Sequence, residues 1–568
     1  MTDRRIIPGF NFTLTLTMAM LMFFILLPLC SVLVYALNLG FAEFFHVIMK
    51  KAVLYAIAVS VGFSFLAALI NTAFGLLLAW VLVRYDFKGK AVLDGMIELP
   101  FALPTAVAGI TLSKLYSDTG FLGRPLSSLG IHVSYTHLGI LTALIFIGIP
   151  FVVRSVQPVL SQLNPAYEEA AFTLGATKSE TFRKVILPEL MPSLLAGFGL
   201  AFARGIGEYG SVVYIAGNSA REHTQVISYV IMQKLNYMDY PSATAIAFVT
   251  LFISFVLLIF INIMQSWQAR RTSGGYEIPA AAGKPDAARE GKILIALSVL
   301  FMIVMLGIPL VFVFAQALSK GPGFYISSLT TDYVKSAFVV TVFVTAITLL
   351  VNTLFGLTAS YLLTRFEFRG KRLLATLIDI PFSISPVIAG LSYIMMFGRM
   401  GWIYPVIDKI NIFLGTDIRI VYDLPGVVLA TIFVTFPFVS REIIPVLNSV
   451  GTDEEEAAAL MGAGGFRIFK RITLPHIRWS LIYGMILCTA RALGEFGAVN
   501  ALSKTRGKTF TLPQEIDALY LAGDSDSIVS AFAASSILVI LAVFILVARQ
   551  FYESRYKNRK GGTGYDAS

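Results

Sequence analysis

Long apolar segments alternate with short charged loops along the whole chain. Segments such as 12–37 and 243–264 carry almost no charged residues. A helix of that length crosses a hydrocarbon layer of about 30 Å, and a chain in lipid must satisfy its backbone hydrogen bonds internally. We therefore predict an all-α polytopic membrane protein. Its expected spans are 11–37, 56–83, 95–116, 138–158, 191–216, 242–264, 292–316, 337–363, 376–398, 426–447, 478–501 and 527–548.

Basic residues are concentrated in alternate loops between these predicted spans. Arg4 and Arg5 precede the first span, Arg84 follows the second, and Arg270 and Arg271 follow the sixth. Because loops rich in Lys and Arg stay in the cytoplasm, this distribution predicts that both termini are cytoplasmic. The first apolar segment is too long for a signal peptide and lacks a small-residue cleavage site, so we interpret it as a retained span.

The chain contains an internal repeat. Segment 71–109 matches 352–390 with a shift of 281 positions, and the charged stretch 169–188 matches 456–475 with a shift of 287. The shared positions in the charged stretch are Glu169, Gly175, Phe182, Leu187 and Pro188, which correspond to Glu456, Gly462, Phe469, Leu474 and Pro475. Parallel repeats of this kind predict two tandem six-helix halves related by a pseudo-two-fold axis along the membrane normal.

This repeat predicts the division of the chain into domains. The expected parts are a first transmembrane domain at 1–264, a cytoplasmic linker at 265–291, a second transmembrane domain at 292–550 and a cytoplasmic tail at 551–568. The linker contains Gly, Ser and Pro in a polar context, which suits a flexible tether.

Composition excludes several classes of function. With 57% hydrophobic and 14% charged residues, the chain is not a soluble domain. The net charge of +10 lies mainly in short loops beside apolar segments, which indicates membrane topology, and we expect no nucleic-acid partner. Cys30 and Cys488 both fall in apolar segments, and the five histidines are scattered. We therefore expect no disulfide, no metal site and no cofactor.

The two charged stretches, about 164–188 and 451–475, are here called the first and second brackets. Asn164 is a candidate N-cap with Pro at the first helical position, so a short helix is expected over 167–174, ending at Gly175. Thr177 and Glu180 have capping-box spacing and start a second short helix that we expect to end before Pro188. In the second bracket, Thr452 and Glu455 offer a capping box for the first short helix. Each bracket presents an exposed Glu-Ala-Ala patch, interpreted as a docking surface; the alternative is a loop-packing device.

The pattern Glu-Ala-Ala-x-x-x-Gly followed by Leu-Pro resembles the cytoplasmic signature loop of ABC importer permeases. This resemblance implies the type I importer fold, two copies of a cytoplasmic ATP-binding subunit, an extracytoplasmic solute-binding protein and a location in the bacterial inner membrane. It implies ATPase-coupling roles for Glu169, Ala170, Ala171, Gly175, Glu456, Ala457, Ala458 and Gly462. The second copy departs from the first at Thr473, where the first has Ile186, and at Gly464-Gly465, where the first has Thr177-Lys178.

Other stretches resemble a narrower group. Segment 99–109 looks like one permease subunit of the sulfate/thiosulfate importers, and segments 379–390, 435–442 and 491–499 look like the other. The chain thus resembles a fusion of two subunits. The implied function is translocation of an oxyanion, sulfate or thiosulfate, with the same class carrying molybdate, ferric iron, thiamine or a phosphonate as the alternative.

A second set of residues is a candidate translocation path. Arg204 and Glu208, like Arg491 and Glu495, are four positions apart within a predicted span, which places each pair on one helix face where it can form an ion pair. Charges at mid-bilayer depth usually face a bundle interior or an aqueous path; the alternative is a buried structural pair. The third spans contain prolines, including Pro104 and Pro386, and are expected to be broken helices that line a cavity or simply kink.

An enzyme is not expected. Gly507-Lys508-Thr509 resembles the end of a phosphate-binding loop, but Leu502 occupies the position where that motif needs Gly. ATP hydrolysis is therefore expected on a separate subunit. An ion-coupled secondary transporter would leave the two brackets unexplained, and a membrane enzyme would need a catalytic constellation that the spans do not show.

Overall fold

The computed structural model describes residues 7–164, 166–272 and 289–561, and within these ranges the chain is helical with no strand. The helices of the first half are α1 (Phe10–Leu21), η1 (Met22–Leu26), α2 (Leu27–Asn38), α3 (Phe41–Ile48), α4 (Lys51–Arg84), α5 (Lys90–Met96), α6 (Leu99–Ala102), α7 (Thr105–Tyr116), α8 (Gly123–Ser127), α9 (His137–Gln162), α10 (Ala166–Thr173), α11 (Lys178–Thr181), η2 (Phe182–Ile186), α12 (Leu187–Ile206), α13 (Val212–Ile215), α14 (Ile227–Asn236) and α15 (Tyr240–Thr272).

The second half repeats this order. Its helices are α16 (Arg289–Met302), η3 (Ile303–Gly307), α17 (Ile308–Ala317), α18 (Pro322–Leu329), α19 (Asp332–Arg365), α20 (Lys371–Ser383), α21 (Pro386–Phe397), α22 (Tyr404–Leu414), α23 (Leu424–Thr435), α24 (Phe438–Val450), α25 (Asp453–Leu460), α26 (Gly465–Ile468), η4 (Phe469–Thr473), α27 (Leu474–Leu493), α28 (Gly497–Leu502), α29 (Leu512–Ala522) and α30 (Ser525–Gly561).

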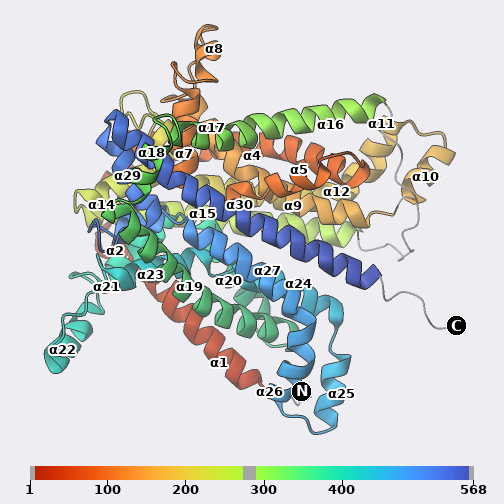
Figure 1. The fold of residues 1–568 in the computed structure, drawn as a ribbon. Coiled ribbons are helices and arrows are strands. Elements are labelled where there is room, and N and C mark those ends of the chain that lie inside the picture. The colour runs from red at the N-terminus through yellow and green to blue at the C-terminus, as the bar shows by residue number, and fades with distance from the viewer. Residues whose placement is uncertain (1–6, 165, 273–288, 562–568) are drawn as a thin grey trace.

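The long helices run together as one bundle with two distinct ends. Figure 1 shows α10 and α25, the first helices of the two brackets, towards one end, here called the bracket end, and α14 and α29 towards the opposite end. The long helix α15 continues to Thr272, into the predicted linker, and α30 continues to Gly561, into the predicted tail. The rest of the linker, 273–288, and the last residues, 562–568, lie outside the described residues.

Eleven of the predicted spans are long and apolar enough to cross a bilayer in the described part of the chain: nine single helices and two bent pairs. The remaining prediction, 478–501, overlaps α27, which contains the polar residues His476 and Arg478. Its packing still identifies it as a bundle helix, because α27 contacts α24 and α19 as α12 contacts α9 and α4.

The third span of each half is a broken helix, as predicted. In the first half, the segments 90–101 and 105–116 meet at an angle of 106°; in the second half, α20 and α21 meet at the same angle. Pro104 precedes α7 and Pro386 begins α21, since proline lacks the donor that a continuous helix needs at that position.

The prediction that Pro188 ends the second bracket helix is wrong. One helix continues from Lys178 to Ile206 through a π-helical turn, η2, and the second half does the same through η4 before Pro475. The same turn precedes Pro28 and Pro309 in the first span of each half. A π-helical turn widens the backbone before the proline ring and allows the helix to pass it.

The fifth spans are shorter than predicted. α12 ends at Ile206 and α27 at Leu493, whereas the predictions continued to 216 and 501. The next residue in each half, Gly207 or Gly494, lies so close to the other half that a Cβ would be 3.0 Å from the Cα of Ser385 or Pro104. Close approach between the halves therefore ends each helix where glycine removes the side chain.

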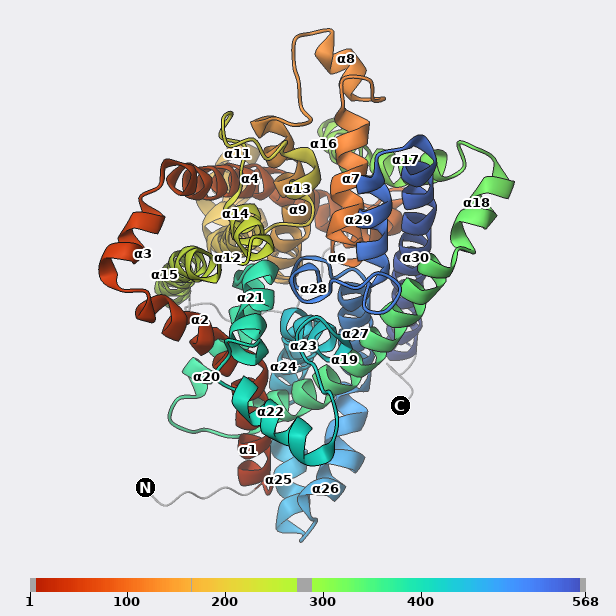
Figure 2. The ribbon, with the colours of Figure 1, turned by 90° about the vertical axis from the view of Figure 1, so that its left-hand side faces the viewer.

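The first span of each half packs against the other half. Helix α1 contacts α19 and α2 contacts α21, while α16 contacts α4 and α17 contacts α7. The Tyr393 hydroxyl donates to the Phe24 carbonyl over 2.8 Å, and the rings of Phe74 and Phe301 stack with centroids 4.1 Å apart. Figure 2, turned by 90°, shows the two halves interlocked, with α28 at the centre of the view.

Candidate functional site

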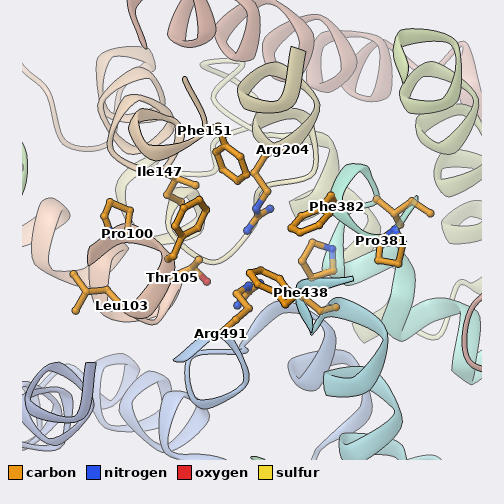
Figure 3. Close-up of a pocket in the computed structure, with 14 residues that line it drawn as sticks. Pro100, Leu103, Thr105, Ile147, Phe151, Arg204, Pro381, Phe382, Phe438 and Arg491 are labelled. Carbon is orange, nitrogen blue, oxygen red and sulfur yellow. The ribbon is translucent and has the colours of Figure 1, made fainter. Parts of the chain in front are cut away.

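A small cavity lies between the two halves, where the bent third spans and the fifth helices meet (Figure 3). Its walls are largely apolar and come from both halves. They consist of Pro100, Phe101, Leu103, Thr105, Ile147, Phe151, Arg204, Pro381, Phe382, Ile384, Pro386, Val434, Phe438 and Arg491. Of the two predicted path prolines, Pro386 lines this cavity, whereas Pro104 packs against Gly494.

Two buried ion pairs lie at this cavity. Arg204 Nη2 is 2.7 Å from Glu208 Oε2, and Arg491 Nη2 is 2.6 Å from Glu495 Oε2. The arginine side chains are 12% and 11% exposed and both glutamates are 1% exposed. The predicted pairing is present, but the reason given for it is wrong. Both glutamates lie beyond the ends of α12 and α27, so the pairs are not formed across one helix face.

Each glutamate is fixed by the turn that follows its helix. The second carboxylate oxygen of Glu208 accepts hydrogen bonds from the backbone N–H and the hydroxyl of Ser211, both over 3.0 Å. The corresponding oxygen of Glu495 accepts only the backbone N–H of Ala498, also over 3.0 Å. Because both carboxylates are held in this way, their charges offset those of the two arginines inside an otherwise apolar cavity.

The arginines retain hydrogen-bonding capacity on the cavity side. A guanidinium group carries five N–H donors in one plane, and a single carboxylate oxygen uses a minority of them. Figure 3 shows the guanidinium groups of Arg204 and Arg491 directed into the cavity from opposite sides. The arrangement offers N–H donors from two directions, which suits a small anion.

A pair of aromatic rings joins the two halves beyond the ends of α12 and α27. Tyr209 and Phe496, which occupy equivalent positions in the repeat, stack with centroids 6.0 Å apart and planes inclined by 10°. Because α12 and α27 begin at the bracket end, residues after their last turns lie further towards the opposite end. The contact therefore lies on the side of Arg204 and Arg491 that faces this opposite end.

The brackets have most of the predicted local structure. Asn164 Oδ1 accepts the N–H of Ala166 at the start of α10, and Gly175 follows that helix with φ of 84°. Thr177 and Glu180 form the predicted capping box before α11. The hydrogen bonds from Thr177 lower the pKa of Glu180, which keeps its carboxylate charged and able to cap. In the second bracket Gly462 has the same φ of 84° after α25.

The predicted capping box of the second bracket is wrong. The Thr452 hydroxyl donates to Glu456 instead, over 2.8 Å, and makes no cap bond to the backbone. Glu455, the predicted partner, is buried and forms an ion pair with Arg365. The ion pair with Arg365 is stronger than a cap to the neutral backbone N–H of Thr452, because both of its groups are charged.

The Glu-Ala-Ala patches are only partly exposed. Glu169, Ala170 and Ala457 are exposed and Glu456 and Ala458 are half-buried, but Ala171 is buried and faces the protein. The strongest exposure belongs to large apolar side chains that sequence reasoning missed: Leu174, Leu460, Met461 and Phe466 are 88%, 77%, 82% and 79% exposed. Apolar groups this exposed at both brackets favour a protein partner over a loop-packing role. The coupling roles of the bracket residues stay predictions.

Comparison with known proteins agrees with this architecture. The family model described as "Binding-protein-dependent transport system inner membrane component" matches twice, at residues 71–274 and 352–557. The sulfate transport system permease protein CysT of Salmonella typhimurium is 47% identical over 274 residues, which cover 48% of this chain and 99% of that protein. CysW of Escherichia coli K12 is 41% identical over 268 residues, which cover 47% of this chain and 89% of that protein.

Each of these relatives is thus about half as long as this chain, and the predicted resemblance to a fusion of two permease subunits is confirmed. A crystal structure of a bacterial alginate ABC transporter overlaps 46% of this chain with 21% identity and a TM-score of 0.40, which is too low to support an argument. The two family matches, one in each half, cover most of the sequence. The chain belongs to the family of binding-protein-dependent transport system inner membrane components.

Proposed function

We propose that this protein is the permease of an ATP-driven importer and that it conducts sulfate or thiosulfate. The observation that carries this proposal is the placement of Arg204 and Arg491 on one cavity between the halves. A tetrahedral dianion matches two planar groups of N–H donors, and the relatives with 41–47% identity are sulfate permeases by name.

The paired glutamates support passage rather than trapping of the anion. Two uncompensated arginines in an apolar cavity would hold a dianion tightly. With Glu208 and Glu495 offsetting their charges, the arginines bind the anion weakly enough to release it. Conduction needs such a balance between entry and release.

The brackets and the opposite end define the proposed partners. One ATP-binding subunit docks on each bracket, which makes two copies, and the exposed Leu174 and Leu460 supply apolar contact. A solute-binding protein delivers the anion at the end where Tyr209 and Phe496 close the path. ATP hydrolysis takes place on the separate subunits and alternately opens the two ends of the cavity.

Both brackets and both termini are cytoplasmic in this proposal, because the basic loops lie at the bracket end. The check uses single cysteines in a chain whose Cys30 and Cys488 are replaced by serine. An impermeant thiol reagent should label a cysteine at Ser134 in intact cells and should not label one at Ser179. Labelling of position 179 from outside contradicts this orientation.

The cargo is tested in a bacterial strain that lacks its own sulfate permeases. Expressed with its ATP-binding subunit and its solute-binding protein, this chain should restore growth on sulfate as the sole sulfur source. Uptake of radiolabelled sulfate should require ATP. Uptake of molybdate, ferric iron, thiamine or a phosphonate without sulfate would show that the cargo is wrong and the class is right. Uptake that follows an ion gradient and not ATP would contradict the class.

A further inference from the structure

Each bracket is tied to the second long helix of its own half by a charged pair. In the first half the Arg84 guanidinium, at the last residue of α4, forms an ion pair with Glu168 in the first turn of α10. In the second half Arg365, at the last residue of α19, forms an ion pair with Glu455 in the first turn of α25. Both glutamates directly precede the Glu-Ala-Ala sequence; Glu455 is buried and Glu168 is half-buried.

The second helix of each bracket is held by the same long helix, one turn earlier. The ring of Trp80 meets the ring of Phe182 edge to face, with centroids 5.5 Å apart and planes inclined by 85°. Tyr361 and Phe469 make the equivalent contact at 6.1 Å and 81°. Two contacts therefore fix each bracket on the end of α4 or α19, one to each arm of the bracket.

The two charged pairs differ in strength. Arg365 Nε lies 2.6 Å from Glu455 Oε2, and its Nη1 donates to the Leu447 carbonyl over 2.9 Å. The Thr473 hydroxyl, from the turn η4, donates to Glu455 Oε1 over 2.6 Å. The side chains of Arg365 and Glu455 are 2% and 3% exposed. Glu455, which lies on the first arm of the bracket, is thus held by α19 and by the second arm.

In the described residues, the Arg84–Glu168 pair has no hydroxyl partner equivalent to that of Thr473. Position 186, which corresponds to Thr473, is Ile, so no hydroxyl can reach Glu168 from the turn η2. Arg84 and Glu168 are 17% and 21% exposed, and water can compete for their charges. The difference between Thr473 and Ile186 therefore separates an anchor made of three side chains from an anchor made of two.

We propose that Arg84–Glu168 and Arg365–Glu455–Thr473 are anchors that transmit movement of the bound ATP-binding subunits to the spans, and that the second anchor is the stiffer one. This inference rests on the proposed function. The glutamates act as positioning residues: they hold the Glu-Ala-Ala surface on α4 and α19 and do not contact the partner. The second half then moves together with its ATP-binding subunit, while the first half follows its own ATP-binding subunit less closely.

The test exchanges the hydroxyl between the two anchors. The full transporter is placed in proteoliposomes with its ATP-binding subunit and solute-binding protein, and ATP hydrolysed per sulfate imported is measured. Thr473→Val, which removes only the hydroxyl donor, should raise this ratio by about tenfold, since one charge-assisted hydrogen bond is lost. Thr473→Ser keeps the donor and should match the wild type. Ile186→Thr, which supplies the missing donor, should lower the ratio.

A second variant separates positioning from folding. Arg365→Met alone leaves Glu455 buried without a counter-charge and is expected to fold poorly. The double variant Arg365→Met with Glu455→Met removes both charges, so it should be found in the membrane at the wild-type level and still hydrolyse ATP without import. The matched control is Lys371→Ala, which breaks the exposed pair of Lys371 with Glu367 beside the same helix end and should leave the ratio unchanged.

The outcomes distinguish the two levels of inference. If the wild-type transporter imports sulfate with coupled ATP hydrolysis but Thr473→Val and the double methionine variant keep the wild-type ratio, the anchors are overturned and the proposed function stands. If the wild type hydrolyses ATP without any sulfate import, the proposed function fails and the anchors fail with it. If Thr473→Ser changes the ratio as Thr473→Val does, the Thr473 hydroxyl does not stiffen the second anchor, and the proposed difference between the anchors is overturned.

Discussion

At the scale of single residues, the arginine–glutamate pairs are the charged groups at the cavity. Sequence spacing indicated that Arg204 and Glu208 could pair, but only the structure shows that Glu208 is held from the other side by Ser211. The equivalent Glu495 has Ala498 in that place, so its carboxylate has one donor fewer. The surroundings of the two arginines therefore differ between the halves, and we expect the two residues to contribute unequally to anion binding.

The first prediction separates a path role from a structural role for these pairs. Arg204→Gln leaves Glu208 buried and unpaired, which should destabilise the protein by about 3–5 kcal/mol and lower its level in the membrane. The double variant Arg204→Gln with Glu208→Gln should recover the membrane level, because it leaves no unpaired buried charge. It should still lack sulfate uptake. Quantitative immunoblots and uptake assays measure the two effects. Wild-type uptake by the double variant would make the pair structural only.

At the scale of elements, the brackets depend on a backbone turn that only glycine adopts at low cost. Gly175 and Gly462 both have φ of 84°, in the left-handed region, and a Cβ at either residue would have no atom of another part of the chain within 4 Å. A substitution is therefore unfavourable because of the backbone conformation and not because of crowding. Another glycine of the second bracket, Gly464, has φ of −69° and equally open surroundings.

The second prediction uses this difference. Gly175→Val and Gly462→Val should each strain the turn by about 1–3 kcal/mol and displace the first bracket helix. Both variants should insert normally and lose sulfate uptake, with the ATP-binding subunits dissociating or hydrolysing ATP without import. Gly464→Val needs no positive φ and is the matched control. Membrane level, co-purified ATP-binding subunit and uptake are measured for each, and full uptake with both Gly175 and Gly462 replaced would exclude the coupling role.

At the scale of the whole molecule, a polar contact joins the halves near the end opposite the brackets. The Tyr214 hydroxyl, from α13, donates to Asp517 Oδ1 in α29 over 2.6 Å. Burial raises the pKa of Asp517 to about 6, although the Tyr214 hydrogen bond and the charge of Lys504 both lower it. Tyr209, which stacks on Phe496 of the other half, also lies within electrostatic reach of this carboxyl.

The third prediction follows from the sign of this shift. Asp517 binds its proton more tightly in the folded protein than in the unfolded chain, where the ordinary pKa of 3.8 applies. Ionisation of Asp517 therefore lowers the free energy of unfolding as pH rises from about 4 to about 6, and causes no further change above that range. The melting temperature of the wild type, relative to Asp517→Asn, should fall across this window and stay level above about pH 7. A constant difference across the whole window would contradict the shift.

The sequence by itself determined the all-helical fold, the repeat, the broken third spans, and the turns at Gly175 and Gly462. These features follow from local causes: the length of an apolar segment, the missing donor of proline, and the φ angles open to glycine. The family resemblance also depended on short motifs that can be read along one stretch of chain. None of these features requires knowledge of what packs against the residue.

The tertiary structure decided which partner each residue meets. It ended α12 at Ile206, because the other half approaches Gly207 closely, and it buried Ala171 while leaving Leu174 exposed. It also took Glu455 from its predicted cap and placed it beside Arg365, a residue 90 positions away in the chain. A charge in a low-dielectric interior pairs with whichever opposite charge the fold brings near, and sequence spacing does not encode that distance.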